Sequence, residues 1–225
     1  MTASVLLRLA GPMQSWGVSS KFEKRDTQHF PTKSGIVGMV ANALGLDFAD
    51  DIGPLAALSL VVRMDRPGTV IRDFHTAGTA YPSGAGGWIS ASGKVDKSQA
   101  KLSDRMYLAD AVFTAALGDA DDELAAAIAE ALRYPARTLD LGRHSCPPSA
   151  PILIAISPDD PMTSIARLPF QGYGKAPAKL RAVWDDPNGT HTADDQPVSF
   201  ALDGRRFAQR TVAIGLIDTP DWQPA

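Results

Sequence analysis

Side chains of the types that can bind single-stranded nucleic acid concentrate near the start of the sequence. They are Gln14, Trp16, Lys21, Lys24 and Arg25. An indole ring can stack on an unpaired base, an amide can bond a base edge, and cations pair with phosphates. This segment therefore predicts a contact with RNA. The sequence leaves two alternatives open, which are burial of Trp16 against the following helix and a merely solvated face for the cations.

Lys33 and Ser34 stand at the start of a helix predicted over residues 33–44. Apolar residues repeat at helical spacing as far as Leu44, and Gly45 ends the helix. The first N–H groups of a helix lack partners within it and carry partial positive charge. With the cation of Lys33 beside them, this end of the helix predicts a site for an RNA phosphate.

Three further groups of candidate RNA-binding residues occur later in the chain. They are Arg72, His75 and Thr76; then Lys101, Arg105 and Tyr107; then Arg143 and His144. The first two groups flank a glycine-rich stretch without steady periodicity, and the two ends of a hairpin lie side by side. Cations and an aromatic ring would then converge beside one base. The alternative is a flexible loop with scattered surface charges.

The same residue types raise the question of catalysis. Metal-independent cleavage of RNA needs a base, an acid and a cation near the scissile phosphate. No pair of histidines has the spacing of metal ligands. We therefore expect no catalytic residues, no metal and no cofactor, with a metal-independent endoribonuclease as the alternative. The residues that could serve such an enzyme are His29, His75 and His144, with Lys33, Lys101 and Tyr107 as their partners.

The composition limits the function classes. The chain has 225 residues, of which 44% are hydrophobic, and it contains a single cysteine, Cys146. Such a chain can bury a core, but it cannot form an intramolecular disulfide or a multi-cysteine metal site. Its apolar runs are too short for a membrane span and no secretory signal pattern is present, so a cytoplasmic location is expected.

The net charge of −3 gives RNA binding no support. Much of the acid lies in short clusters, including residues 185–186 and 194–195, which we interpret as solvated caps and turns. A local patch of cations, rather than the total charge, would therefore have to hold the phosphates.

The elements that must position these groups follow from the periodicity of the apolar residues. Strands are predicted at 4–9, 60–62, 70–75 and 106–117, helices at 33–44 and 121–132, and a further strand at 137–141 or 152–156. The proline-rich remainder has strand-like runs at 179–184, 198–202 and 210–217. The order β-α-β-β-α predicts an α+β fold with an RRM-like (ferredoxin-like) domain and an inserted hairpin. We place this domain at 1–145 and a small β-rich C-terminal part at 146–225.

Four sequence runs carry a resemblance to a known family. They are LRLAGPMQSWG at 7–17, FPTKSGIVGMVANALG at 30–45, RDFHTAG at 72–78 and LGRHSCPP at 141–148. In this order the runs resemble the fifth-family RAMP subunits of type I-E CRISPR Cascade complexes. The resemblance covers roughly the first two thirds of the chain, and its motifs are specific in combination.

The resemblance implies a non-catalytic subunit that binds and caps the 5′ handle of crRNA in antiviral defence. It implies an RRM-like RAMP domain with a thumb hairpin at about 76–105. The neighbours would be the terminal Cascade backbone subunit and the large PAM-reading subunit, with target DNA contacted indirectly and no membrane involved. The implied handle contacts are Gln14, Trp16, Lys33, Ser34, Arg143 and His144.

Two alternatives remain beside this expectation. A related subtype of the same family cleaves pre-crRNA, which keeps the endoribonuclease open, although the type I-E-like motifs favour a role without cleavage. A scaffold subunit that makes no direct contact with RNA is the other alternative.

Overall fold

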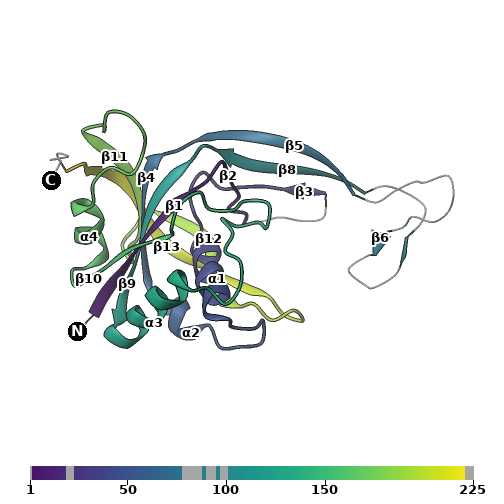
Figure 1. Cartoon of the computed structure of the whole chain (residues 1–225), viewed down its shortest axis with the longest axis horizontal. Helices are drawn as coiled ribbons and strands as arrows, with labels where there is room; N and C mark the ends of the chain where they lie inside the picture. The colour runs from purple at the N-terminus through teal and green to yellow at the C-terminus, as the bar shows by residue number, and fades with distance from the viewer. Residues whose placement is uncertain (1, 19–22, 78–87, 90–94, 97–100, 221–225) are drawn as a thin grey trace.

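The structure of the protein is a computed structural model that describes residues 2–18, 23–77, 88–89, 95–96 and 101–220. Within them, seven strands form one antiparallel sheet in the order β10-β1-β9-β4-β11-β13-β12 (Figure 1). Their bounds are β1 Thr2–Ala10, β4 Ser59–Arg66, β9 Val112–Asp121, β10 Leu153–Ser157, β11 Lys179–Asp185, β12 His191–Ser199 and β13 Arg206–Asp218. The protein therefore mixes helices and strands, as the sequence predicts.

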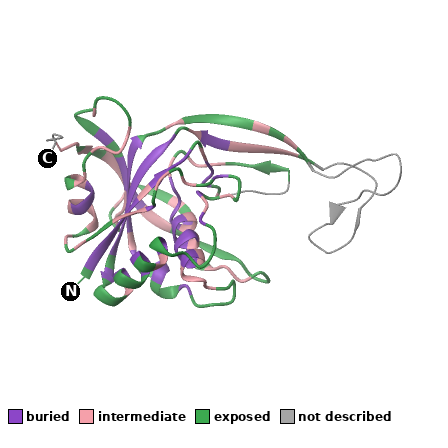
Figure 2. Ribbon diagram, viewed as in Figure 1, coloured by how far each residue is buried: buried purple, intermediate pink, exposed green. Residues whose placement is uncertain are grey.

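Alternation along β1 divides its apolar side chains between the two faces of the sheet. Leu7 and Leu9 belong to the large core that includes α1 (Lys33–Leu44) and α3 (Asp122–Arg133), whereas Leu6 packs with Ile165 of α4 (Pro161–Arg167). A short helix, α2 (Gly53–Ala57), begins at the Gly-Pro pair. Figure 2 shows the buried residues gathered along the strands and the helix faces that cover them.

The two long helices begin and end where capping chemistry places them. The Thr32 hydroxyl accepts the N–H of Gly35 at 3.2 Å, and Gly45 ends α1 with a φ of 79°. The carboxylate of Asp121 accepts the N–H of Leu124 at 2.7 Å and caps α3. The predicted bounds of α1 are therefore confirmed, and those of α3 are shifted by one residue.

A long two-stranded ribbon leaves the main sheet (Figure 1). It consists of β5 (Thr69–Ala77) and β8 (Lys101–Ala109), which are antiparallel and paired along their whole length. Two short strands, β2 (Met13–Gln14) and β3 (Lys24–Arg25), also pair with β8, and β6 (Trp88–Ile89) pairs with β7 (Val95–Asp96). Most of the predicted thumb at 76–105 lies outside the described residues, but its two ends are paired as a hairpin requires.

Three sequence predictions need correction. The predicted strand at 106–117 is two strands, because Asp110 adopts a φ of 55° and separates β8 in the ribbon from β9 in the main sheet. The strand following α3 is β10, so the placement at 152–156 holds and the one at 137–141 does not. The run at 198–202 lies mostly beyond β12, because the chain turns there before β13.

The C-terminal strands continue the sheet rather than starting another. β11 pairs with β4, and β13 and β12 follow it outward. The sheet therefore runs through both parts of the predicted division at residue 145.

A buried ion pair fixes the loop that follows α4. Arg63 and Asp65 have fully buried side chains, and their Nη2 and Oδ1 atoms are 2.8 Å apart. Arg63 also donates to the carbonyl of Leu168 at 2.7 Å, while Asp65 accepts the N–H of Gln171 at 2.8 Å. These bonds replace the water that the two buried charges would otherwise bind, so the loop after α4 is held firmly against β4.

The turn at Gly142 packs directly on the chain that leads into α1. Gly142 has a φ of 94°, and a Cβ at this position would lie 1.7 Å from the carbonyl oxygen of Ser15. We expect Gly142→Ala to lower the free energy of unfolding by more than about 2 kcal/mol, because left-handed strain adds to this overlap. Urea unfolding of the purified chain measures the decrease.

Gly204→Ala is the matched control, since a Cβ there meets nothing within 4 Å. Its unfolding free energy should stay within about 0.5 kcal/mol of the wild type. Equal stability of the two variants would contradict the close approach at Gly142.

Candidate nucleic-acid interface

The predicted contact of Gln14 and Trp16 with RNA is contradicted by their burial. They are 0% and 1% exposed. The indole N–H of Trp16 donates to Oε1 of Gln14 at 3.0 Å, and the Gln14 amide donates to the carbonyl of Ala111 at 2.8 Å. A Cβ added to Gly35 would lie 2.8 Å from Cε3 of Trp16, so the indole packs on α1. Of the two alternatives for Trp16, burial against the helix is the one observed.

Lys33 is equally unavailable to a phosphate, because its charge is used within the chain. The residue is 5% exposed, and its Nζ lies 3.2 Å from Oδ2 of Asp185. Its backbone N–H donates to Oδ2 of Asp195 at 2.7 Å. The start of α1 thus already binds a carboxylate, which contradicts the predicted phosphate site. Ser34 beside it is half-buried.

Arg210 completes this arrangement by binding both acids. Its Nε and Nη2 donate to Oδ1 and Oδ2 of Asp195 at 2.6 and 3.0 Å, and its Nη1 donates to Asp185. Burial alone would lower the pKa of Arg210, but the carboxylates of Asp195 and Asp185 outweigh it and raise the pKa. We call Lys33, Asp185, Asp195 and Arg210 the corner network. The interpretation of Asp185 and Asp195 as solvated turn residues is therefore wrong.

A different set of predicted residues does come together, along β8. β3 pairs with β8 in parallel, and this places Arg25 opposite Arg105. Arg143, from the turn after α3, donates through Nη1 to the carbonyl of Met106 at 3.2 Å and through Nη2 to that of Arg25 at 3.0 Å. We call Lys24, Arg25, Arg105, Tyr107 and Arg143 the β8-edge cluster.

Tyr107 lies beneath Arg143 in this cluster, and its side chain is buried. Its ring is covered by Arg143, whose guanidinium carbon is 4.8 Å from the ring centroid, and its hydroxyl is 3.4 Å from Oγ of Ser145. Burial opposes ionisation of Tyr107, but the bond to Ser145 and the charge of Arg143 outweigh it and lower the pKa below 10.0. Tyr107 therefore supports a planar cation that can meet a base or a phosphate, instead of stacking on a base itself.

Arg72, His75 and Thr76 lie on β5 of the ribbon, outside the β8-edge cluster. Arg72 is exposed and pairs with Asp104 at 2.7 Å, and His75 lies 3.5 Å from Asp73. Thr76 is exposed. The side chain of Lys101 and the whole of Lys21 lie outside the described residues.

The turn after α3 exposes one histidine. His144 has a side chain that is 98% exposed, and its Nδ1 is 2.5 Å from Oδ2 of Asp140. Within the described part of the chain, no group of three or more His, Cys, Asp or Glu side chains could hold a metal ion. In the same residues, no helix has the length and apolar character needed to cross a membrane.

Sequence reasoning missed the partners that decide which cations are free. Asp185 and Asp195 bind Lys33 from positions 152 and 162 residues further along the chain, and no local spacing indicates such contacts. Ser145, which contacts Tyr107, is different, because it directly follows the predicted residues Arg143 and His144. Its place in that run is a signal that could have identified it.

Comparison with known proteins identifies relatives over most of the chain. Residues 4–213 match the family model described as CRISPR-associated protein (Cas_Cas5). The chain is 33% identical to the CRISPR system Cascade subunit CasD of Escherichia coli (strain K12), with 68% of this chain and 71% of that protein covered. A chain of a CRISPR RNA-guided surveillance complex gives a TM-score of 0.82 at 32% identity, covering 97% of this chain and 91% of that one. A crystal structure of a Cas protein gives 0.76 at 33% identity, covering 98% and 100%.

The corner network makes a stability prediction. We expect Asp195→Asn to lower the free energy of unfolding by about 3 kcal/mol, because it leaves buried cations with too little counter-charge. Urea unfolding measures the change. Asp194→Asn is the matched control, because this neighbouring side chain is exposed and accepts a hydrogen bond from Gln209 at 2.7 Å. A decrease of equal size in both variants would contradict the special role of Asp195.

The contact between Tyr107 and Arg143 makes a prediction about pH. In Arg143→Gln the pKa of Tyr107 should rise toward 10.0, because the guanidinium no longer stabilises the phenolate. Since the folded-state pKa is depressed, the stability that it contributes is present above the ordinary value of 10.0 and disappears as pH falls through the folded-state pKa. Phenolate absorbance during a pH titration, taken as the difference from Tyr107→Phe, measures the shift.

Arg133→Gln is the control for this titration, since Arg133 is an exposed residue of α3. It should leave the absorbance curve of Tyr107 where it is in the wild type. A curve that is also unchanged in Arg143→Gln would refute the contact.

Proposed function

Because the chain belongs to the Cas5 family of CRISPR-associated proteins, we propose that it is a non-catalytic subunit of a type I-E Cascade surveillance complex. In this role it binds and caps the 5′ handle of crRNA during antiviral defence in the cytoplasm. The likeness to a Cascade subunit and to a chain of an RNA-guided surveillance complex supports the assignment.

The order of the elements supports an RRM-like domain at the centre of the fold. The chain runs β1-α1-β4-β9-α3-β10, and these strands lie in the antiparallel order β10-β1-β9-β4. This is the β-α-β-β-α-β pattern of ferredoxin-like domains. The ribbon of β5 and β8 is inserted between β4 and β9, which suits a thumb that projects from such a domain (Figure 1).

The observation that carries RNA binding is the β8-edge cluster. Lys24 and Arg25 are exposed, and Arg143 is fixed by carbonyl groups and the ring of Tyr107. Because Arg143 is already held in place, it loses little conformational entropy when it binds a phosphate. The handle of a crRNA is single-stranded, so its bases are free to meet a planar guanidinium.

The proposal includes neighbours on either side of the chain. They are the terminal backbone subunit and the large PAM-reading subunit, and target DNA would be reached only through the guide RNA. With a net charge of −3, the isolated chain should hold RNA weakly, so most of the binding free energy would come from the assembly.

The competing hypothesis of an endoribonuclease is weakened because one of the cations proposed for it already has a partner. Lys33 is bound to Asp185 in the corner network, so it is not free to stabilise a reacting phosphate. Incubation of the purified chain with repeat RNA in EDTA separates the hypotheses. We expect intact RNA, whereas specific cleavage that disappears in His29→Ala, His75→Ala or His144→Ala would favour the endoribonuclease.

The β8-edge cluster makes a prediction about salt. When the double variant Lys24→Gln/Arg25→Gln is co-expressed with the other subunits and a repeat–spacer RNA, it should retain less RNA. The slope of log affinity against log salt should fall by about 0.7 for each phosphate that the variant no longer neutralises. RNA retained by the purified complex over a series of salt concentrations measures this.

Arg133→Gln is the control, since this exposed side chain belongs to α3 and pairs with Glu130 of the same helix at 3.7 Å. It should leave the slope unchanged. A slope equal to the wild type in the double variant would remove the cluster from the RNA interface.

A further inference from the structure

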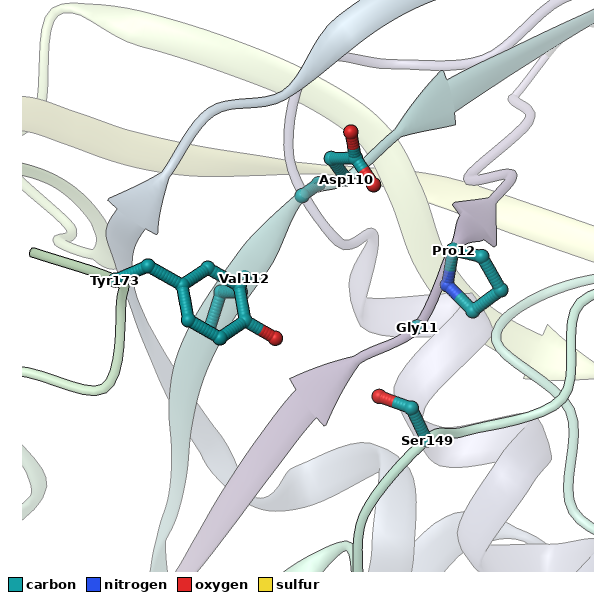
Figure 3. Close-up of a pocket in the computed structure, with 7 residues that line it drawn as sticks. Gly11, Pro12, Asp110, Val112, Ser149 and Tyr173 are labelled. Atoms are coloured by element: carbon teal, nitrogen blue, oxygen red, sulfur yellow. The ribbon is translucent and has the colours of Figure 1, made fainter.

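A cavity opens where the ribbon leaves the main sheet. Its volume is about 220 Å³, and its wall includes Pro12, Asp110, Val112, Ser149 and Tyr173. Figure 3 shows these side chains placed around the hollow from separate segments of the chain. Pockets for drug-sized ligands have volumes of about 300–1,000 Å³, so this smaller cavity suits a single small ring system.

Asp110 gives the wall of the cavity a hydrogen-bond acceptor on a backbone turn that is held in place. Its φ of 55° lies in the left-handed region, which residues other than glycine seldom adopt. Its backbone N–H donates to the carbonyl of Pro12 at 3.1 Å, which fixes the turn. The carboxylate is 67% exposed and lies 3.9 Å from Nη2 of Arg66, which is too long for a hydrogen bond. Both oxygens therefore keep the capacity to accept.

Tyr173 and Ser149 complete the wall. The ring of Tyr173 is 67% exposed, and the guanidinium carbon of Arg66 lies 5.7 Å from its centroid. The loop that carries this ring is fixed two residues earlier by the bond from Gln171 to buried Asp65. Ser149 donates its hydroxyl to the carbonyl of Ala10 at 3.1 Å, so its oxygen remains an acceptor.

We infer that this cavity binds a single unpaired nucleobase that presents two adjacent donors, which is the Watson–Crick edge of guanine. The inference rests on the proposed function, because it places one base of the bound nucleic acid. Asp110 directly follows β8, the strand that carries Tyr107, which is three residues or about 10 Å away. A short single strand can therefore contact the β8-edge cluster and the cavity together.

The acceptor chemistry selects guanine among the bases. A carboxylate accepts two parallel hydrogen bonds from the ring N–H and the exocyclic amine of guanine. Adenine and cytosine each place an acceptor nitrogen beside the amine, and uracil has one donor between two carbonyl groups. These acceptors would face the oxygens of Asp110 and reduce the binding free energy.

The charges make a basic protein side chain the poorer occupant. Arg66 already stands beside both Asp110 and Tyr173, so a second cation would meet repulsion. An apolar side chain would leave the carboxylate without a partner. A neutral, flat group with donors on its edge can donate to the Asp110 carboxylate and stack on the Tyr173 ring.

The test uses the full chain and four nucleotides observed by ligand-detected NMR. GMP and IMP differ only in the exocyclic amine, so phosphate contacts cancel in their comparison. We expect GMP to bind about tenfold more tightly than IMP, as the absence of one hydrogen bond to a charged group implies. The deoxy forms of both nucleotides show whether the sugar contributes to binding. Tighter binding of the ribose forms points to RNA, whereas equal binding shows that the base alone is recognised.

The variants assign the preference to the cavity. Asp110→Asn should abolish the discrimination between GMP and IMP, while Asn still tolerates the left-handed backbone. Asp119→Asn is the matched control, because Asp119 is exposed, has a φ of 62° and lies at the far end of β9. Tyr173→Ala should weaken GMP binding, whereas Tyr134→Ala, at another exposed tyrosine, should not.

Two results would overturn the inference. One is equal binding of GMP and IMP to the wild type, and the other is discrimination that survives Asp110→Asn. If the assembled complex still retains RNA in either case, only the cavity assignment fails. If the complex holds no RNA at all, the proposed function fails with it.

Discussion

The corner network keeps two cations of this protein, Lys33 and Arg210, bound to carboxylates of the same chain. Lys33 and Arg210 are bound by Asp185 and Asp195, and one of these carboxylates also accepts the first N–H of α1. Buried charges are tolerated only when they are paired and hydrogen-bonded, so none of these groups is available to a ligand without breaking the others. The network also joins the last strands of the chain to its first helix.

With that corner closed, Lys24 and Arg25 on β3 are exposed cations that lie alongside β8. β8 is the shared element, since it pairs with β2, β3 and β5. Arg143 reaches β8 from a turn that depends on the absence of a side chain at Gly142. The β8-edge cluster lies beside the middle of β8 and the cavity lies at the end of β8, so the proposed RNA strand would contact both along one path.

The sequence predicted the features that neighbouring residues determine, which are the ends of helices and the positions of strands. Thr32 and Gly45 mark the ends of α1, and apolar periodicity located the strands on either side of it. The break at Asp110 was missed because the apolar residues continue through it, and only the positive φ separates β8 from β9. Lys33 was correctly placed at the start of a helix, but its partners come from β11 and β12, and sequence spacing does not indicate contacts so distant.

The central claim is that RNA lies along β8 and away from the start of α1. Photocrosslinking of a crRNA with photoreactive bases in the handle, followed by mass spectrometry of the assembled complex, tests it directly. The account predicts crosslinked peptides that contain Arg25, Arg105 or Arg143, and none that are crosslinked at Trp16 or Lys33. Crosslinks confined to Gln14, Trp16, Lys33 and Ser34 that leave β8 unlabelled would contradict it.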